Sequence, residues 1–165
     1  MTEPRVRFST IADAPRIAKI YEHHVLYGTA TFDLVPPTEE DWRSKISTIL
    51  ANQWPFLVYE AGDEIAGYAY ATQFRDRPAY VETCEDSIYV AHDRLGLGIG
   101  TSLLNSLLSA SYESRFRQMI AVIGGGELAS VSLHKKCGFE HAGRMRSVGI
   151  KFGKHLDTVY MQRAL

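Results

Sequence analysis

Between residues 87 and 101 the chain reads SIYVAHDRLGLGIGT, and this stretch constrains the fold more than any other. It begins with an apolar segment, Ile88 to Val90, and continues through three glycines at alternate positions into a leucine-rich helical pattern. Glycines let the backbone approach a ligand closely, and the first N–H groups of a helix have no partners within it. These groups and the helix dipole favour a phosphate, so the pattern predicts an anion site. The alternative is a tight strand-to-helix turn that binds nothing.

The glycine spacing narrows the class of ligand. Gly96, Gly98 and Gly100 form G-x-G-x-G, whereas the dinucleotide fingerprint is G-x-G-x-x-G, followed by an acidic residue after a second strand. The nucleoside-triphosphate loop ends in Gly-Lys-Ser/Thr, which does not occur in this chain. Neither ligand class is therefore indicated.

The loop resembles the pyrophosphate loop of the GNAT-type N-acetyltransferase superfamily, which binds acetyl-coenzyme A (acetyl-CoA). In that family the loop reads Gln/Arg-x-x-Gly-x-Gly/Ala; Gly98 and Gly100 take the glycine positions, and Leu95 stands where Gln or Arg is usual. Most phosphate contacts in such a loop come from backbone N–H groups. The resemblance implies that acetyl-CoA contacts Ile88, Tyr89, Val90, Leu95, Gly96, Leu97, Gly98, Ile99, Gly100 and Thr101.

A second motif of the superfamily lies at residues 127–139. In the family it reads Asn-x-x-Ala/Ser-x-x-Leu-Tyr-x-x-x-Gly-Phe, and this chain matches it at Ser130, Leu133, Gly138 and Phe139. Glu127 replaces the Asn that typically contacts the pantetheine arm, so Glu127 and Ser130 are expected to contact the cofactor. His134 replaces the Tyr that often protonates the departing thiolate, which implies a role as acid or proton shuttle. The alternative is a structural histidine bonded to a neighbouring carbonyl.

The Leu-His form of this motif resembles the phosphinothricin acetyltransferase branch, whose relatives acetylate methionine sulfone and methionine sulfoximine. Parts of the branch pattern recur at residues 74–80, 83–90 and 148–157. The resemblance implies an N-acetyltransferase that moves an acetyl group from acetyl-CoA to the amine of a small amino acid or analogue. It also implies a homodimer whose interface lies close to the acceptor clefts. A CoA-binding regulatory protein without turnover, and an acetyltransferase for protein N-termini or polyamines, are the alternatives.

Amide formation from an amine and a thioester needs a base for the ammonium and donors for the oxyanion. Glu85 is the candidate base because it lies on the strand just before the loop, where partial burial would raise its pKa. Glu82 offers a similar carboxylate three residues earlier, and the branch pattern favours Glu85. The backbone N–H groups near Tyr89 and Val90 are the candidate oxyanion donors.

The charged loop before this strand is the candidate acceptor site. Arg75 and Arg77 carry guanidinium groups that match a carboxylate in a two-bond fork, so they are expected to hold the carboxylate of an amino-acid acceptor. A pair of solvated loop charges is the alternative. Phe32, Phe74 and Tyr80 are candidate walls of the acceptor pocket, although each also fits a core position. The basic character of the loop argues against polyamines.

Hydrophobic periodicity predicts the element order β-α-α-β-β-β-α-β-α-β-β. This order predicts a GNAT-like α/β (α+β) fold: a mixed, mostly antiparallel twisted sheet with helices on both faces, formed by residues 1–165 as one domain. Ile11, Ile17 and Tyr21 share one face of the first helix, and Trp42, Ile46 and Leu50 share one face of the second. The expected strands are 5–9, 55–61, 65–74, 83–90, 119–123 and 156–162, with an extended segment from Phe139. The helix after the glycine loop is expected to run to about residue 116, and a short helix is expected from 129 to 137. The apolar strand 119–123 is expected to be covered on both faces.

Composition limits the partners and the compartment. With a net charge of −1, the sequence gives no reason to expect a nucleic-acid or membrane partner. Two cysteines do not make a disulfide framework, and the N-terminus lacks the apolar region of a signal peptide, so a cytoplasmic location is expected. No metal site is expected, because His134 and Cys137 lack a second ligand pair.

Overall fold

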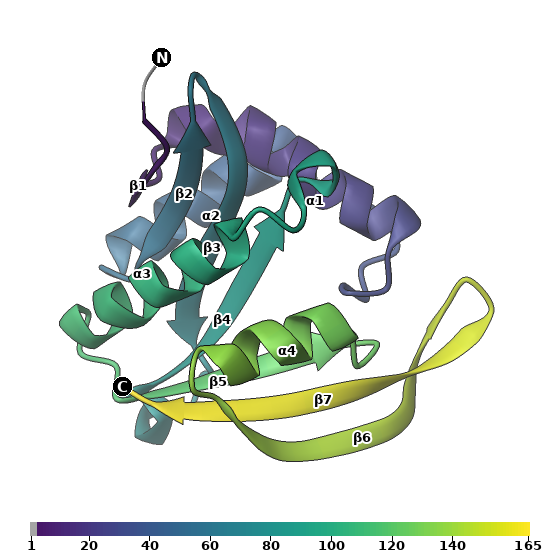
Figure 1. The fold of residues 1–165 in the computed structure, drawn as a ribbon. Helices are drawn as coiled ribbons and strands as arrows, with labels where there is room; N and C mark the ends of the chain where they lie inside the picture. The colour runs from purple at the N-terminus through teal and green to yellow at the C-terminus, as the bar shows by residue number, and fades with distance from the viewer. Residues whose placement is uncertain (1–2) are drawn as a thin grey trace.

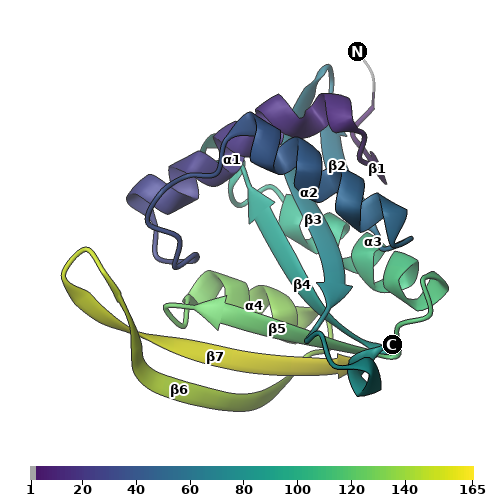
Figure 2. The same ribbon diagram turned by 180° about the vertical axis from the view of Figure 1, so that it is seen from behind.

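The structure is a computed structural model that describes residues 3–165. Seven strands form one twisted sheet in the order β1-β2-β3-β4-β5-β7-β6, with α3 and α4 on one face and α1 and α2 on the other (Figures 1 and 2). The strands are β1 (Arg5–Phe8), β2 (Phe56–Ala61), β3 (Glu64–Gln73), β4 (Thr83–Val90), β5 (Gln118–Gly124), β6 (Glu140–Lys151) and β7 (Lys154–Ala164). The helices are α1 (Ala14–Tyr27), α2 (Glu39–Ala51), α3 (Ile99–Glu113) and α4 (Leu128–Lys136), with short 3-10 turns η1 (Ile11–Asp13), η2 (Pro78–Tyr80) and η3 (His92–Arg94). The predicted fold class is confirmed.

Local sequence signals explain where the elements begin and turn. Thr38 and Asp41 form the predicted capping box before α2, with the Thr38 N–H donating to Asp41 at 2.8 Å and the Asp41 N–H donating to Thr38 Oγ1 at 3.1 Å. Gly62 adopts a φ of +66° at the first position of the β2–β3 turn, a conformation that favours glycine. The helix expected to reach about residue 116 ends at Glu113, since Arg115 takes a φ of +74°.

Two hydrophobic cores lie on opposite faces of the sheet. Residues such as Leu103, Leu107 and Met119 form the core beneath α3 and α4, while Ile17, Trp42 and other residues of α1 and α2 form the second. Two expected inward positions are wrong: Ile11 is 46% exposed in the turn before α1, and Leu50 is 37% exposed near the end of α2. Ile11 lies before the first residue of α1 and Leu50 lies in the last turn of α2, and at these ends the apolar side of each helix no longer faces the sheet.

The strand expected to be covered on both faces is instead covered on one. Met119, Ala121 and Ile123 of β5 are buried in the core beneath α3 and α4, whereas Ile120 and Val122 are only partly buried. The continuous apolar run therefore hides an alternation of burial. The less buried face of β5 lies on the side of the sheet where α1 and α2 do not extend over it (Figure 2).

The sheet divides at its centre. Strands β4 and β5 form the one parallel pair within residues 3–165, and their register ends at Asp86 opposite Ala121. Beyond this point β4 continues to Val90 beside β3, and β5 continues to Gly124 beside β7. The two strands diverge visibly in Figures 1 and 2. Past this point, the backbone N–H and C=O groups of β4 and β5 that face each other have no strand to bond to.

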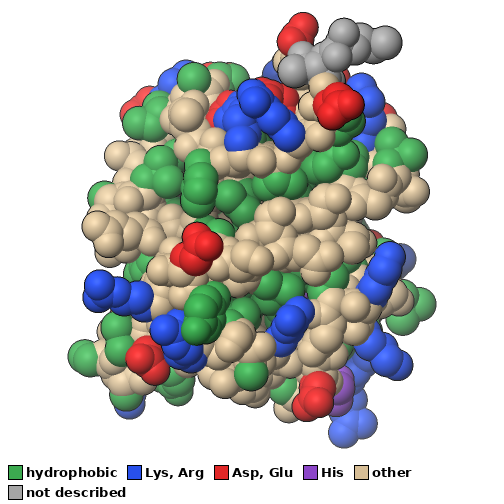
Figure 3. Space-filling model, turned by 60° about the vertical axis from the view of Figure 1, so that its left-hand side comes forward, with side chains coloured by type: hydrophobic (Ala, Val, Ile, Leu, Met, Phe, Trp, Pro, Cys, Tyr) green, Lys and Arg blue, Asp and Glu red, His purple; other side chains and the backbone are tan. Residues whose placement is uncertain are grey.

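The long β6–β7 hairpin closes one side of the sheet and leaves β6 as an exposed edge strand. On the face in Figure 3, basic, acidic and hydrophobic side chains are interspersed, in keeping with the net charge of −1. Within residues 3–165 no helix has the length and apolar character needed to cross a membrane.

Candidate active site

A cavity of about 600 Å³ occupies the separation between β4 and β5. Its walls come from the end of β4, the loop before α3, the end of β5 and the first turns of α4. Every residue expected to contact the cofactor lines it except Leu97, which points to solvent with 66% of its surface exposed. Glu85, His134 and Phe32 line it too, so the cavity brings together motifs that lie up to 102 residues apart in the chain.

The glycine loop forms one end of this cavity. Gly96 and Gly98 have φ values of +76° and +78°, and no atom lies within 4 Å of the position a Cβ would take at either residue. Backbone conformation therefore requires glycine here. At Gly100 the reason is space, because a Cβ would lie 3.2 Å from the Leu133 side chain of α4. Gly98 caps α3, so the first N–H groups of this helix are free to bind an anion at the cavity.

The end of β4 provides further backbone donors. In an antiparallel ladder every second residue directs its N–H and C=O toward the neighbouring strand. The Ala91 N–H donates to the Ala66 carbonyl oxygen of β3. Every second residue before Ala91, beginning with Tyr89, therefore also directs its N–H toward β3. Ile88 and Val90 therefore direct theirs into the separation. The backbone donors that face the cavity are therefore the N–H groups of Ile88 and Val90, and the Tyr89 N–H faces β3 instead.

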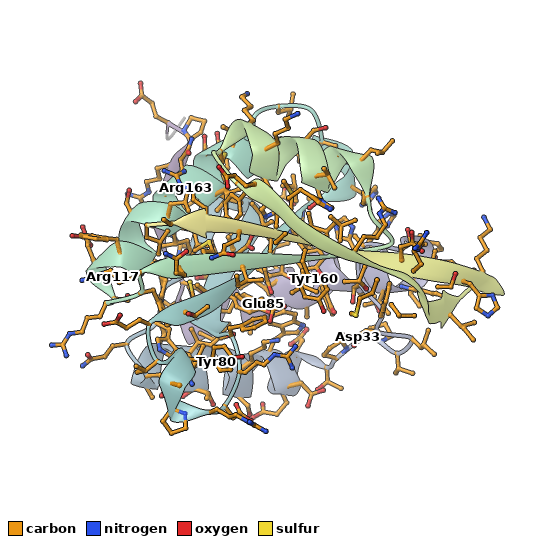
Figure 4. The ribbon with its side chains drawn as sticks, turned by 90° about the horizontal axis from the view of Figure 1, so that it is seen from below. Asp33, Tyr80, Glu85, Arg117, Tyr160 and Arg163 are labelled. Carbon is orange, nitrogen blue, oxygen red and sulfur yellow. The ribbon has the colours of Figure 1, made fainter. Side chains whose placement is uncertain are left out.

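Glu85 lies on the open face of the sheet at the other end of the cavity. The strand registers place it in one row with Thr72 of β3, Ile120 of β5 and Gln162 of β7. Figure 4 shows its side chain near the middle of the molecule, between Tyr80 and Tyr160 in that view. Burial raises the pKa of Glu85 and the neighbouring Asp86 raises it further, while Arg75 and Lys45 oppose both effects. Glu82, the alternative base, is exposed and does not line the cavity.

Comparison with known proteins agrees with this geometry. A family model described as an acetyltransferase (GNAT) domain matches residues 6–160. The chain belongs to the GNAT acetyltransferase family. The phosphinothricin N-acetyltransferase of Alcaligenes faecalis is 47% identical over 154 residues, which cover 93% of this chain and 78% of the relative. The L-methionine sulfoximine/L-methionine sulfone acetyltransferase of Pseudomonas aeruginosa is 35% identical, with coverages of 95% and 92%.

A solved structure gives the same assignment. The phosphinothricin acetyltransferase of Sinorhizobium meliloti, crystallised with acetyl-CoA, superposes with a TM-score of 0.96 at 42% identity and covers 99% of this chain and 89% of its own. This chain is thus an acetyl-CoA-dependent acetyltransferase. Its glycine loop fits a pyrophosphate, because the loop offers free N–H groups and no side chain fills the space at Gly96 or Gly98. Ile88 and Val90 line the same cavity and direct their N–H groups into it, where they can donate to acetyl-CoA.

In this GNAT acetyltransferase, His134 lies beneath the cavity and contacts β4. Its Nε2 lies 2.7 Å from Asp86 Oδ2, and its Nδ1 lies 2.7 Å from the carbonyl oxygen of Ser130. The ring is 2% exposed, and Phe139 packs against it edge-on. The contact with the Ser130 carbonyl matches the structural reading of this histidine, and the contact with Asp86 was not anticipated from the sequence.

The loop between α1 and α2 lines one side of the cavity and is held by hydrogen bonds from two elements, α1 and β6. Tyr21 of α1 bonds Thr31 Oγ1 at 2.7 Å and donates to Asp33 at 2.5 Å. The buried Lys151 of β6 donates to the Thr31 carbonyl at 2.9 Å. Burial lowers the pKa of Lys151, and Asp33 opposes this effect. These contacts hold the loop that carries Phe32 in place.

Phe32 itself lies against two glycines. A Cβ at Gly149 of β6 would lie 2.4 Å from the Phe32 ring, and one at Gly124 of β5 would lie 3.2 Å from it. The two glycines therefore leave a slot for the ring, which lines the cavity as expected. A sequence pattern could have indicated this slot only through Gly149 in the 148–157 segment, because Gly124 lies within a glycine run.

The other four expected acceptor residues lie outside the cavity. Arg75 and Arg77 are exposed in the β3–β4 loop, and the Phe74 and Tyr80 rings pack edge-on with centroids 5.6 Å apart. The Arg75 guanidinium lies 4.9 Å from the centre of the Phe74 ring. Arg75 nevertheless acts on Glu85 electrostatically, so the loop lies near the base at the open face of the sheet.

Two residues that the sequence analysis did not single out complete the site. His24 of α1 donates from Nε2 to the Val90 carbonyl at 2.8 Å and so fixes the free end of β4. Lys45 of α2 lies 4.8 Å from the centre of the Tyr70 ring and adds positive charge near Glu85. One histidine of the adjacent pair His23 and His24, and one lysine on an amphipathic helix, carry no sequence signal for such roles. No group of three metal-ligating side chains occurs among residues 3–165.

Proposed function

We propose that this acetyltransferase acetylates the α-amine of a small amino acid or amino-acid analogue, of the phosphinothricin and methionine sulfoximine or sulfone type. The observation that carries the proposal is the position of Glu85, a half-buried carboxylate at the end of a cavity whose other end is the glycine loop. The names of the relatives from A. faecalis and P. aeruginosa support the acceptor class.

The residues divide the reaction between them. Glu85 takes a proton from the acceptor ammonium, which frees the nitrogen lone pair for attack. The Ile88 and Val90 N–H groups stabilise the negative charge that develops on the acetyl oxygen. Acetyl-CoA supplies a thioester, so the new C–N bond forms and the C–S bond breaks with a thiolate leaving; the second proton lost by the attacking nitrogen balances that thiolate, and CoA departs as the thiol. His24 keeps the Val90 backbone in position through its carbonyl.

The proposal is tested with a panel of amines, acetyl-CoA and a thiol reagent. We expect thiol release with methionine sulfone, methionine sulfoximine and phosphinothricin, and much less with polyamines or peptides. If no amine in the panel releases thiol above the background hydrolysis, the enzyme reading fails and a CoA-binding regulatory protein replaces it. If only polyamines or peptide N-termini react, the acceptor class is wrong.

The same panel tests the arginines of the β3–β4 loop. Arg75→Ala and Arg77→Ala are expected to raise the KM for amino acids, because each removes a guanidinium partner for the acceptor carboxylate. The KM of a carboxylate-free amine of similar shape should change much less. Arg115→Ala, an exposed arginine at the end of α3, is the matched control. Equal losses for both kinds of substrate would contradict the carboxylate role.

We further propose that the protein is a homodimer that works in the cytoplasm. The exposed edge strand β6 supports the dimer, since it carries apolar side chains such as Ile150, which is 65% exposed, next to the Phe32 slot. Light scattering should give twice the 18.5 kDa of one chain, and Ile150→Glu should shift the mass toward one chain whereas Ile11→Glu should not. A native mass of 18.5 kDa at working concentration would contradict the dimer.

The buried free thiols of Cys84 and Cys137 suit a reducing compartment.

A further inference from the structure

Asp86 is a buried carboxylate at the point where the sheet divides. Its side chain is 1% exposed, and it forms the last register pair of β4 with β5. Its neighbours across both strands are the small residues Ala71 and Ala121. Among the residues that the structure describes, Asp86 Oδ2 bonds His134 and Oδ1 has no partner. His134 is thus the polar side chain that partners this buried carboxyl group.

The contacts of His134 place one proton on Nδ1 and tie the state of Nε2 to the charge of Asp86. A carbonyl oxygen accepts hydrogen bonds and cannot donate them, so Nδ1 carries the proton that bonds Ser130. If Asp86 is ionised it too can only accept, and Nε2 then also carries a proton, which makes the ring an imidazolium. Burial lowers the pKa of His134, but the charge and hydrogen bond of Asp86 and the Ser130 carbonyl outweigh it, and the net direction is upward.

The pair also joins the two walls of the cavity. Asp86 belongs to β4, which carries the Ile88 and Val90 donors, while His134 and Ser130 belong to α4. Asp86, Ser130 and His134 all line the cavity. As an imidazolium, with both ring nitrogens donating, His134 would have no lone pair with which to accept the proton of the acceptor amine.

We propose that Asp86 is a positioning residue that holds His134 as a fixed imidazolium beside the cavity, so that His134 favours the departing thiolate by its charge and does not serve as a base. The catalytic part of this inference rests on the acetyl transfer proposed above, whereas the charge of the pair does not. A positive charge held in a water-poor site stabilises developing negative charge without reorganisation during the reaction.

The other titratable groups around the pair leave this assignment intact. On β4, burial raises the pKa of the Cys84 thiol to about 12, so it stays neutral. At the end of α4, burial raises the pKa of Cys137, although Arg163 of β7 opposes it. Glu85 projects to the opposite face of β4 and titrates in the acceptor site.

Nuclear magnetic resonance of ¹⁵N-histidine-labelled protein tests the proposal without turnover. In the native protein both His134 ring nitrogens should be protonated at pH 8, with the signal assigned by its loss in His134→Gln and its retention in His141→Gln, an exposed matched control. In Asp86→Asn the midpoint of His134 titration should fall by roughly one to three pH units, the range for loss of an adjacent carboxylate. The kcat of Asp86→Asn should fall while its Kd for acetyl-CoA, measured by calorimetry, changes little.

The outcomes separate this inference from the proposed function. A His134 ring with one unprotonated nitrogen at pH 8 in the native protein overturns it, because the pair would then not hold the imidazolium. An unchanged His134 titration in Asp86→Asn overturns it too, and an unfolded Asp86→Asn leaves the native spectrum to decide. An imidazolium signal in a protein that acetylates no amine refutes the proposed function and keeps the charged pair.

Discussion

Glu85→Gln is expected to lower kcat by on the order of a hundredfold or more, with little change in the Kd for acetyl-CoA. The amide keeps the shape of the carboxylate and its place on the open face of β4, but it cannot take the ammonium proton. The glycine loop and the Ile88 and Val90 donors lie elsewhere in the cavity and are not altered. Steady-state kinetics with a thiol reagent and calorimetry with acetyl-CoA measure the two quantities separately.

The pH dependence gives this prediction its sharpest form. Because burial and Asp86 raise the pKa of Glu85, native kcat/KM should fall on the acid side as this carboxylate is protonated, at a higher pH than an exposed glutamate would give. In Glu85→Gln the remaining activity depends on acceptor amine that is already neutral. The deficit of the variant should therefore narrow as the pH approaches the pKa of the amine.

Glu82→Gln is the matched control, since Glu82 is an exposed carboxylate just before the same strand. It should retain nearly native kcat at every pH. A Glu85→Gln variant as active as the native enzyme across the pH range would place the base elsewhere. Glu82 or an ordered water would then be the next candidate.

The sequence predicted the parts of the site that depend on backbone conformation and local order. Gly96 and Gly98 need positive φ, and Thr38 caps a helix with a residue three positions on; such rules act within a few residues and are readable from the chain. The element order followed from periodicity in the same way. Glu85 could be placed beside the cofactor loop because both lie on one strand.

The unpredicted parts depend on contacts between distant segments. His134 and Asp86 lie 48 residues apart, on α4 and β4, and they meet only in the folded chain. Lys151 and Thr31 lie 120 residues apart. The burial of β5 alternates because helices α1 and α2 end before they cover its second face. No spacing within one segment encodes such contacts, which arise only when strand register and helix packing are fixed.

Acetyl-CoA is expected to raise the Tm of the native protein, and Gly98→Glu is expected to abolish that increase. A ligand at 100 times its Kd stabilises the folded state by about 2.7 kcal/mol, which corresponds to roughly 5–10 °C for a chain of this size. The carboxylate of Gly98→Glu would project from the cap of α3 into the anion site, where its charge repels the pyrophosphate and its bulk occupies the space.

The substitution also strains the backbone, so the comparison must isolate binding from strain. Gly62→Glu is the matched control: Gly62 has a φ of +66°, close to the +78° of Gly98, and neither position has an atom within 4 Å of an added Cβ. Both variants should therefore lose a similar amount of intrinsic stability. Gly62 lies in the β2–β3 turn outside the cavity, so Gly62→Glu should keep the full increase in Tm. If Gly98→Glu keeps it as well, the glycine loop does not bind the pyrophosphate, and the anion site must be sought at another part of the cavity.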